Sequence, residues 1–270
     1  MRKRILTAVV LVPLLLAILL VAPKIMTAIL VSCMSVLAVY ELLSGTGLVR
    51  HLRLVVYSVS VAAVIPFCCF FEMSPIWCQL ILLSFFCAMF AEVMASHIKV
   101  RFEKICICLF AGILIPYLFS ALVRILCSHN GRYLILVPFV VAFLSDTGAY
   151  FVGCRFGKRK LAPVISPNKS VEGLVGGLAF AVTGMLLYTL IMQVAFKLEV
   201  NYIYALLYGI IGAAADAFGD LCFSAIKRQT GIKDYGNLIP GHGGILDRFD
   251  SMLIVAPLME ALLVILPVVS

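Results

Sequence analysis

Charge is the scarcest property of this 270-residue chain: Asp, Glu, Lys and Arg make up only 13% of it, whereas 64% is hydrophobic. Soluble domains carry about 25% charged and about 45–50% apolar residues. The chain therefore has too few polar side chains to cover a water-soluble core of its size, and its mean hydropathy of +1.15 agrees. The composition excludes a soluble globular protein and predicts a polytopic membrane protein, with lipid as the solvent for much of the surface.

The ten cysteines lack the spacing of a metal site or a disulfide framework, because no CxxC pair occurs and most of them lie inside apolar runs. We interpret them as small buried residues. The sequence also lacks an internal repeat, a low-complexity tract and a linker between soluble domains. Its polar segments are too short to fold alone, which favours inserts packed against a helix bundle.

Nine apolar runs are long enough to cross the roughly 30 Å of hydrocarbon in a bilayer. The first run follows a basic start, as in a signal peptide, but no convincing A-x-A cleavage site follows, so we expect an uncleaved first span. The nine predicted spans are 5–22, 25–44, 54–71, 76–96, 105–126, 133–153, 174–196, 202–223 and 252–269.

The distribution of Lys and Arg supports this count. With nine spans, 17 of the 21 basic residues fall on one side of the membrane, and only Lys24, Arg124, Arg132 and Lys197 on the other. Positive charge marks cytosolic segments, so we expect a cytosolic N-terminus and a C-terminus across the membrane. The net charge of +8 then reports topology, and we expect no nucleic-acid partner.

The predicted fold is an all-α, polytopic membrane helix bundle of about nine transmembrane helices with two cytosolic polar inserts, 154–173 and 224–251. Residues 1–130 would form about five N-terminal spans. Residues 131–270 would form a C-terminal catalytic region that carries both inserts.

Several carboxylates lie where lipid is expected. Asp146 is in the sixth predicted span, and Asp216 and Asp220 are in the eighth. An ionised Asp at the centre of a span costs about 2.5–3.5 kcal/mol, so these acids must line a polar cavity, lie near the cytosolic end or hold cations. The spacing of Asp216 and Asp220 places them on one helical face, and Asp247 and Asp250 would share a face if that stretch is helical. Such faces would suit Mg²⁺.

The blander alternative is that these Asp residues are helix caps or pair with basic side chains at the membrane interface. We expect Glu41, Glu92 and Glu260, which are isolated acids on other spans, to be structural or interfacial and not catalytic.

The first insert is basic, with Arg155, Lys158, Arg159 and Lys160. Such a cluster fits either topology alone or the binding of lipid headgroups and nucleotide phosphates. Ser170, or else Ser166, would cap the following helix, whose N-terminal amides would favour a phosphate. The pair Gly173 and Gly177 is typical of close helix packing.

The second insert contains Pro240-Gly241-His242-Gly243-Gly244, which can hardly be helical. Its glycines would let backbone amides approach an anion. His242 would donate to a phosphate or a leaving group, or else be a hydrogen-bonded turn residue.

The run SAIKRQTGIKDYGNLIPGHGGILDRFD, Ser224 to Asp250, is similar to the signature of the phosphatidate cytidylyltransferase (CDP-diacylglycerol synthase) family. The stretches DTGAY at 146–150 and SPNKSVEG at 166–173 also resemble this family. The resemblance covers the C-terminal half, and the N-terminal spans share only hydropathy.

The resemblance implies transfer of a cytidylyl group from CTP to phosphatidate, with Mg²⁺ required and a monovalent cation as an open addition. It implies catalytic roles for Lys227, Arg228, His242, Asp247 and Asp250. Substrate binding would fall to Lys169, Glu172, Ser224, Lys233, Asp234, Gly243, Gly244 and Arg248, and metal binding to Asp220, Asp247, Asp146 and Asp250. We expect a multi-pass protein of a bacterial inner membrane, in contact with membrane lipids, and a homodimer stays open.

Two other functions remain open at this point. A CTP-dependent kinase acting on a polyprenol-type lipid would use similar charges. A cation-coupled secondary transporter would place its acids near the midplane of repeated halves, whereas here the acids gather toward one side.

Overall fold

The computed structural model describes residues 13–95, 100–238 and 243–269. The chain divides into two compact units. The first unit contains residues 1–128 and 230–249, and the second contains residues 129–229 and 250–270. Most of the second predicted insert therefore packs with the N-terminal spans, an association that sequence spacing does not indicate.

Seven helices in the described ranges are long and apolar enough to cross a membrane, and they match the second to eighth predicted spans. The protein is thus a helical, polytopic membrane protein. The first predicted span, 5–22, lies partly outside the described residues. The last differs from its prediction, because α13 covers only Met252–Ile265. Fourteen residues rise only about 21 Å, and Pro267 disfavours helical backbone at Leu266.

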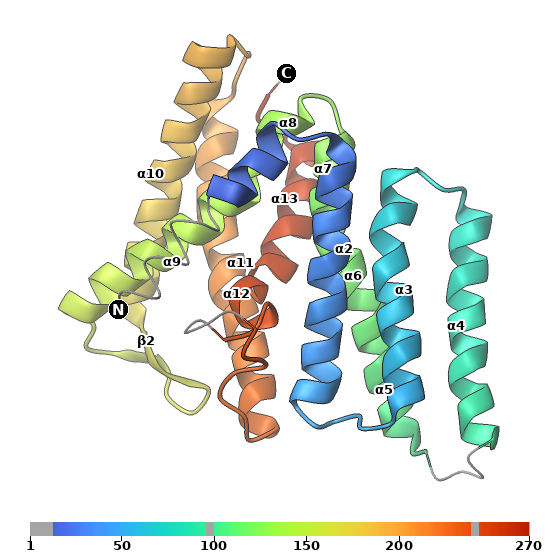
Figure 1. Cartoon of the computed structure of the whole chain (residues 1–270). Helices are drawn as coiled ribbons and strands as arrows, with labels where there is room; N and C mark the ends of the chain where they lie inside the picture. Colours follow the sequence, from blue (N-terminus) through green and yellow to red (C-terminus); the bar gives the residue numbers. More distant parts are fainter. Residues whose placement is uncertain (1–12, 96–99, 239–242, 270) are drawn as a thin grey trace. The chain divides into compact units, whose positions relative to one another are not determined.

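The first unit is built on α2 (Lys24–Tyr40), which continues into the π-helical turn η1 (Glu41–Gly45). It packs against α3 (Leu52–Phe70), and α4 (Pro75–Ala95) lies along α3 (Figure 1). The predicted fifth span is a broken helix, in which a π-helical turn precedes Pro116. Its segments are α5 (Phe102–Leu109), η2 (Phe110–Leu114), α6 (Ile115–Phe119) and α7 (Ala121–Cys127). The four-residue α12 (Leu246–Phe249) contacts α2.

The second unit begins with α8 (Gly131–Leu134) and is built around α9 (Leu136–Phe156), α10 (Val171–Phe196) and α11 (Tyr202–Gln229), which pack side by side (Figure 1). The predicted close packing at Gly173 and Gly177 is confirmed. A Cβ on Gly177 would lie 2.8 Å from the Ser145 carbonyl oxygen, and one on Gly173 would lie 2.9 Å from that of Ala149. Only glycine lets α10 approach α9 so closely.

The first insert folds into a hairpin that the sequence analysis did not predict. Strands β1 (Lys160–Ala162) and β2 (Ser166–Ser170) pair antiparallel, with Lys160 opposite Ser170 and Ala162 opposite Ser166. Helix α11 also extends beyond the predicted end at residue 223 to Gln229. Ser224, Lys227 and Arg228 therefore lie on the last turns of a helix and not in a loop.

Candidate functional site

Four aspartates of the second unit lie near one another. Asp146 comes from α9, Asp216 and Asp220 from α11, and Asp250 from the turn before α13. Asp216 interacts electrostatically with Asp146, and Asp250 interacts with Asp220 and Asp146. The contacts of α9, α11 and α13 bring these acids together. The fold thus gathers three predicted metal ligands with Asp216.

Asp216 is the most deeply buried member of the group, with 2% of its surface exposed. The side chains of Ser145 and Ser251 lie near its carboxylate. Nevertheless, its Oδ1 atom is buried and has no hydrogen-bond partner among the described residues. A buried carboxylate oxygen without a partner is costly, and a bound cation would remove that cost.

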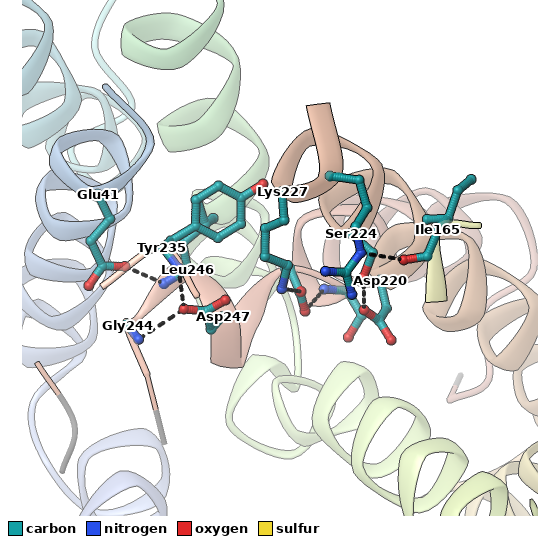
Figure 2. Close-up of polar contacts among 12 residues, drawn as sticks. Glu41, Ile165, Asp220, Ser224, Lys227, Tyr235, Gly244, Leu246 and Asp247 are labelled. Atoms are coloured by element: carbon teal, nitrogen blue, oxygen red, sulfur yellow. Dashed lines mark hydrogen bonds and ion pairs between the residues drawn. The ribbon is translucent and has the colours of Figure 1, made fainter. Parts of the chain in front are cut away.

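Two lysines contact the acidic group. Lys169 Nζ, from β2, lies 2.5 Å from Asp220 Oδ2, and Lys227 Nζ, from α11, lies 3.8 Å from Asp250 Oδ2. Ser224 Oγ donates to Asp220 Oδ1 at 3.1 Å (Figure 2). Burial and the nearby Asp220 carboxylate raise the pKa of Asp250 to about 7, although the Lys227 ammonium opposes this rise.

Four carboxylates thus lie in one region, and Lys169 and Lys227 form ion pairs with two of them. Within the described ranges, however, no three His, Cys, Asp or Glu side chains are arranged as a ready metal site. Mg²⁺ commonly binds through one or two carboxylates and completes its shell with water and substrate phosphates. The Asp216 oxygen, which has no hydrogen-bond partner among the described residues, and the four clustered carboxylates therefore fit Mg²⁺ bound together with a phosphorylated substrate.

A cavity of about 570 Å³ opens beside this group. Its polar lining includes Asp146, Asp216 and Lys169, and its apolar lining includes Leu161 and Leu174. A pocket with an apolar wall and a few converging charges suits a ligand that is partly apolar and partly anionic. It lies between α9, α10, β2 and α11, entirely within the second unit.

The first insert is held in place by its own flanking helix. Glu172, in the first turn of α10, accepts hydrogen bonds from the backbone N–H groups of Lys158 at 3.0 Å and Arg159 at 3.1 Å. Ser170 Oγ accepts from Gly173 N–H at 3.1 Å, so the predicted cap is confirmed at Ser170. Arg228 Nε donates to the Ile165 carbonyl oxygen at 3.0 Å and ties the hairpin to α11.

The described part of the second insert is organised by two carboxylates of the first unit. Asp247 Oδ2 accepts from Tyr235 N–H at 2.7 Å and from Gly244 N–H at 3.0 Å (Figure 2). Glu41 accepts from the backbone N–H groups of Ile245 and Leu246. A shared face of Asp247 and Asp250 was expected only if the stretch were helical, and this condition is not met. Helix α12 ends at Phe249, and Asp250 follows it and belongs to the second unit.

The remaining predicted site residues lie on or beside this insert. Lys233, Asp234 and Arg248 are exposed, and Gly243 has the left-handed φ of +85° that favours glycine. His242 lies outside the described residues. The roles assigned to all of these residues stay predictions.

Two residues matter more in the structure than the sequence analysis indicated. Asp216 was placed with Asp220 on a helical face that would suit Mg²⁺, but it was not among the assigned metal ligands. Glu41 was interpreted as an isolated structural acid, and no local pattern links it to residues 245 and 246, which follow it by 204 and 205 positions.

The helix bundle and its charged cavity place this chain in the class of polytopic membrane proteins that have a polar site between their helices. The model of the Cytidylyltransferase family matches residues 2–266, and the chain therefore belongs to that family.

Curated relatives agree with this assignment. The chain is 48% identical to a phosphatidate cytidylyltransferase of Bacillus subtilis over 136 residues, which cover 50% of this chain and 49% of the relative. It is 43% identical to one of Staphylococcus saprophyticus over 155 residues, which cover 57% and 56%. The chain thus spans about half the length of the curated relatives it matches.

Proposed function

We propose that this protein is an integral-membrane phosphatidate cytidylyltransferase, which makes CDP-diacylglycerol and pyrophosphate from CTP and phosphatidate for phospholipid synthesis. The observation that carries the proposal is the cavity of the second unit, where Lys169 meets Asp146 and Asp216 beside an apolar wall. Family membership and the names of the curated relatives support the same reaction.

The proposed reaction needs little general-base catalysis. The nucleophile is a phosphate oxygen of phosphatidate, which is already anionic. A bond forms between this oxygen and the α-phosphorus of CTP, the bond from the α-phosphorus to the bridging oxygen breaks, and pyrophosphate leaves with that electron pair. The main obstacle is repulsion between two polyanions, so catalysis is chiefly positioning and charge stabilisation.

The lysines supply positive charge for this task. Lys169 and Lys227 are held against Asp220 and Asp250, at the ends of β2 and α11, where they would bind phosphate oxygens. Arg228 adds a guanidinium that is oriented by the Ile165 carbonyl. An Arg or Lys fixed by a second contact loses less conformational freedom when it binds a phosphate.

The carboxylates of the second unit would hold Mg²⁺ through Asp216, Asp220 and their neighbours Asp146 and Asp250. When bound, the ion would neutralise phosphate charge that the lysines alone leave unbalanced. A ligand role for Asp247, a second, monovalent cation and a homodimer stay predictions from the sequence. The charge distribution supports a cytosolic N-terminus, with both inserts on the cytosolic side in a bacterial inner membrane.

The test uses the purified full chain in mixed micelles with labelled CTP, phosphatidate and varied Mg²⁺. We expect pyrophosphate release matched by label incorporated into lipid, and loss of both in chelator. A CTP-dependent lipid kinase would instead release CDP and phosphorylate a polyprenol-type acceptor. A secondary transporter would give neither product, and either outcome would reject the proposed reaction.

A further inference from the structure

Glu41 is an acid of a membrane-span helix that bonds to a distant loop. It opens the π-helical turn η1 at the end of α2 and is only 5% exposed. Its Oε1 atom accepts from Ile245 N–H at 3.0 Å. Its Oε2 atom accepts from Leu246 N–H at 2.8 Å, as Figure 2 shows. Both oxygens of one buried carboxylate thus bind consecutive amides of the second insert.

The backbone around these bonds is closely fitted to the end of the span. A Cβ on Gly244 would overlap the Glu41 carboxylate, and a Cβ on Gly45 would overlap the Tyr235 carbonyl oxygen. Such contacts leave no room for the insert to slide along the helix end. The position of residues 244–246 is therefore set by Glu41 together with the local bond from Gly244 N–H to Asp247.

The same segment carries Asp247. That carboxylate accepts from Tyr235 N–H and Gly244 N–H, so Glu41 and Asp247 together bind four amides of the insert. Moving Ile245 and Leu246 would move the residue that follows them. Glu41 thus acts on Asp247 through two peptide units, without touching its side chain in these bonds.

Glu92 is the informative contrast within the same unit. It is also buried, with 7% exposure, but its Oε1 atom lies 3.5 Å from Arg53 Nη1 and 3.7 Å from His51 Nε2. Glu92 forms a structural ion pair with Arg53 that joins α4 to α3. Glu41 instead uses its charge to orient backbone N–H groups. Such charge-assisted hydrogen bonds are stronger than hydrogen bonds between neutral groups.

We propose that Glu41 is a positioning residue for the reaction: it fixes the Gly243–Asp247 segment so that this segment can serve CTP or its metal ion. This inference rests on the proposed function for the reaction, but its geometric part stands independently. A misplacement of about 1 Å can cost about 100-fold in rate, so a span residue that touches no substrate can control turnover.

The experiment compares Glu41→Gln with Glu92→Gln, the matched change at an equally buried acid. Gln keeps one acceptor and turns an NH₂ group toward an amide donor, which breaks one of the two bonds. For each purified variant, kcat and KM for CTP are measured together with hydrogen–deuterium exchange of peptides covering 235–247. We expect Glu41→Gln to lower kcat roughly 10- to 100-fold and to speed exchange at 245 and 246, while the other peptides stay unchanged.

Three results would overturn the inference: faster exchange with unchanged kcat, lower kcat with unchanged exchange, or equal effects of Glu41→Gln and Glu92→Gln. If Glu41→Gln speeds hydrogen–deuterium exchange throughout the protein, the Glu41→Asp variant is measured instead. Asp keeps both acceptor oxygens on a shorter side chain. We then expect an intermediate kcat, and a wild-type kcat with a released loop would reject the inference. If the wild-type protein releases no pyrophosphate, the proposed function fails, while the exchange data still test the geometry.

Discussion

The two polar inserts are held by the same chemistry but over very different distances. In the first, Glu172 binds the amides of residues 13 and 14 positions before it, and a β-hairpin and a serine cap complete the structure. In the second, Glu41 binds amides more than 200 positions away, and the described part contains only the four-residue α12. One insert folds on its neighbours in sequence, and the other depends on a remote span.

The comparison also concerns burial. Glu172 makes its bonds at an exposed position, whereas Glu41 is almost fully buried. Water can replace the partners of an exposed carboxylate at little cost, but not those of a buried one. The second insert should therefore be the more fragile of the two, and the following substitutions test this expectation.

The largest effect is expected where the first insert meets the acidic group. Asp220→Asn removes the charge that holds Lys169 and leaves that ammonium without its 2.5 Å partner. We expect cytidylyl transfer to fall at least about 100-fold, as for the loss of a major electrostatic group. Labelled CTP incorporation measures this, with the exposed Glu103→Gln as control. Near-normal turnover would remove Asp220 from the site.

The two anchors can be compared directly. We expect Glu172→Gln to lower kcat only about two- to fivefold, because solvent competes for the amides of Lys158 and Arg159. Glu41→Gln should cost roughly 10- to 100-fold. Steady-state kinetics on both variants give the ratio. A larger loss for Glu172→Gln would reverse the comparison and make the first insert the more fragile.

A stability test addresses the contact between the second insert and the η1 turn at the end of α2. Gly45→Ala adds a methyl group against the Tyr235 carbonyl, and overpacking of this kind typically costs about 1–3 kcal/mol. We expect a lower thermal midpoint together with faster exchange at residue 235. Ser44→Ala, the neighbouring change in η1, is the control. An unchanged midpoint would mean that the insert does not rest on this helix end.

The smallest effect is expected at the cap of the first insert. Ser170→Ala removes the acceptor for Gly173 N–H, and loss of an N-cap typically costs about 1 kcal/mol. In a chain of this size, that corresponds to about 2–4 °C in the thermal midpoint. Ser166→Ala, in the same strand, should change it less. A larger decrease in the thermal midpoint for Ser166→Ala than for Ser170→Ala would show that Ser170 is not the cap.

Some features followed from the sequence because they depend on neighbours along the chain. The apolar runs predicted seven observed span-length helices, and the spacing of Gly173 and Gly177 predicted close packing. Ser170 or Ser166 was expected as a cap, and Ser170 is the one that caps α10. The i,i+4 spacing also predicted that Asp216 and Asp220 lie on one face of the same helix. Helix ends were predicted less well than the helices themselves. Helix α11 extends to Gln229, where Arg228 contacts the hairpin, a contact that the local sequence does not indicate.

The sequence by itself determined that the chain is a membrane helix bundle with charged inserts, because hydropathy, charge and glycine spacing act over a few turns of helix. Only the tertiary structure decided that Lys169 pairs with Asp220 and that Glu41 binds Ile245 and Leu246. It also decided that one Asp216 oxygen finds no hydrogen-bond partner in the part of the chain that the structure describes. These facts join segments that are distant along the chain. Such contacts depend on how helices pack, and no local pattern of residues encodes that packing.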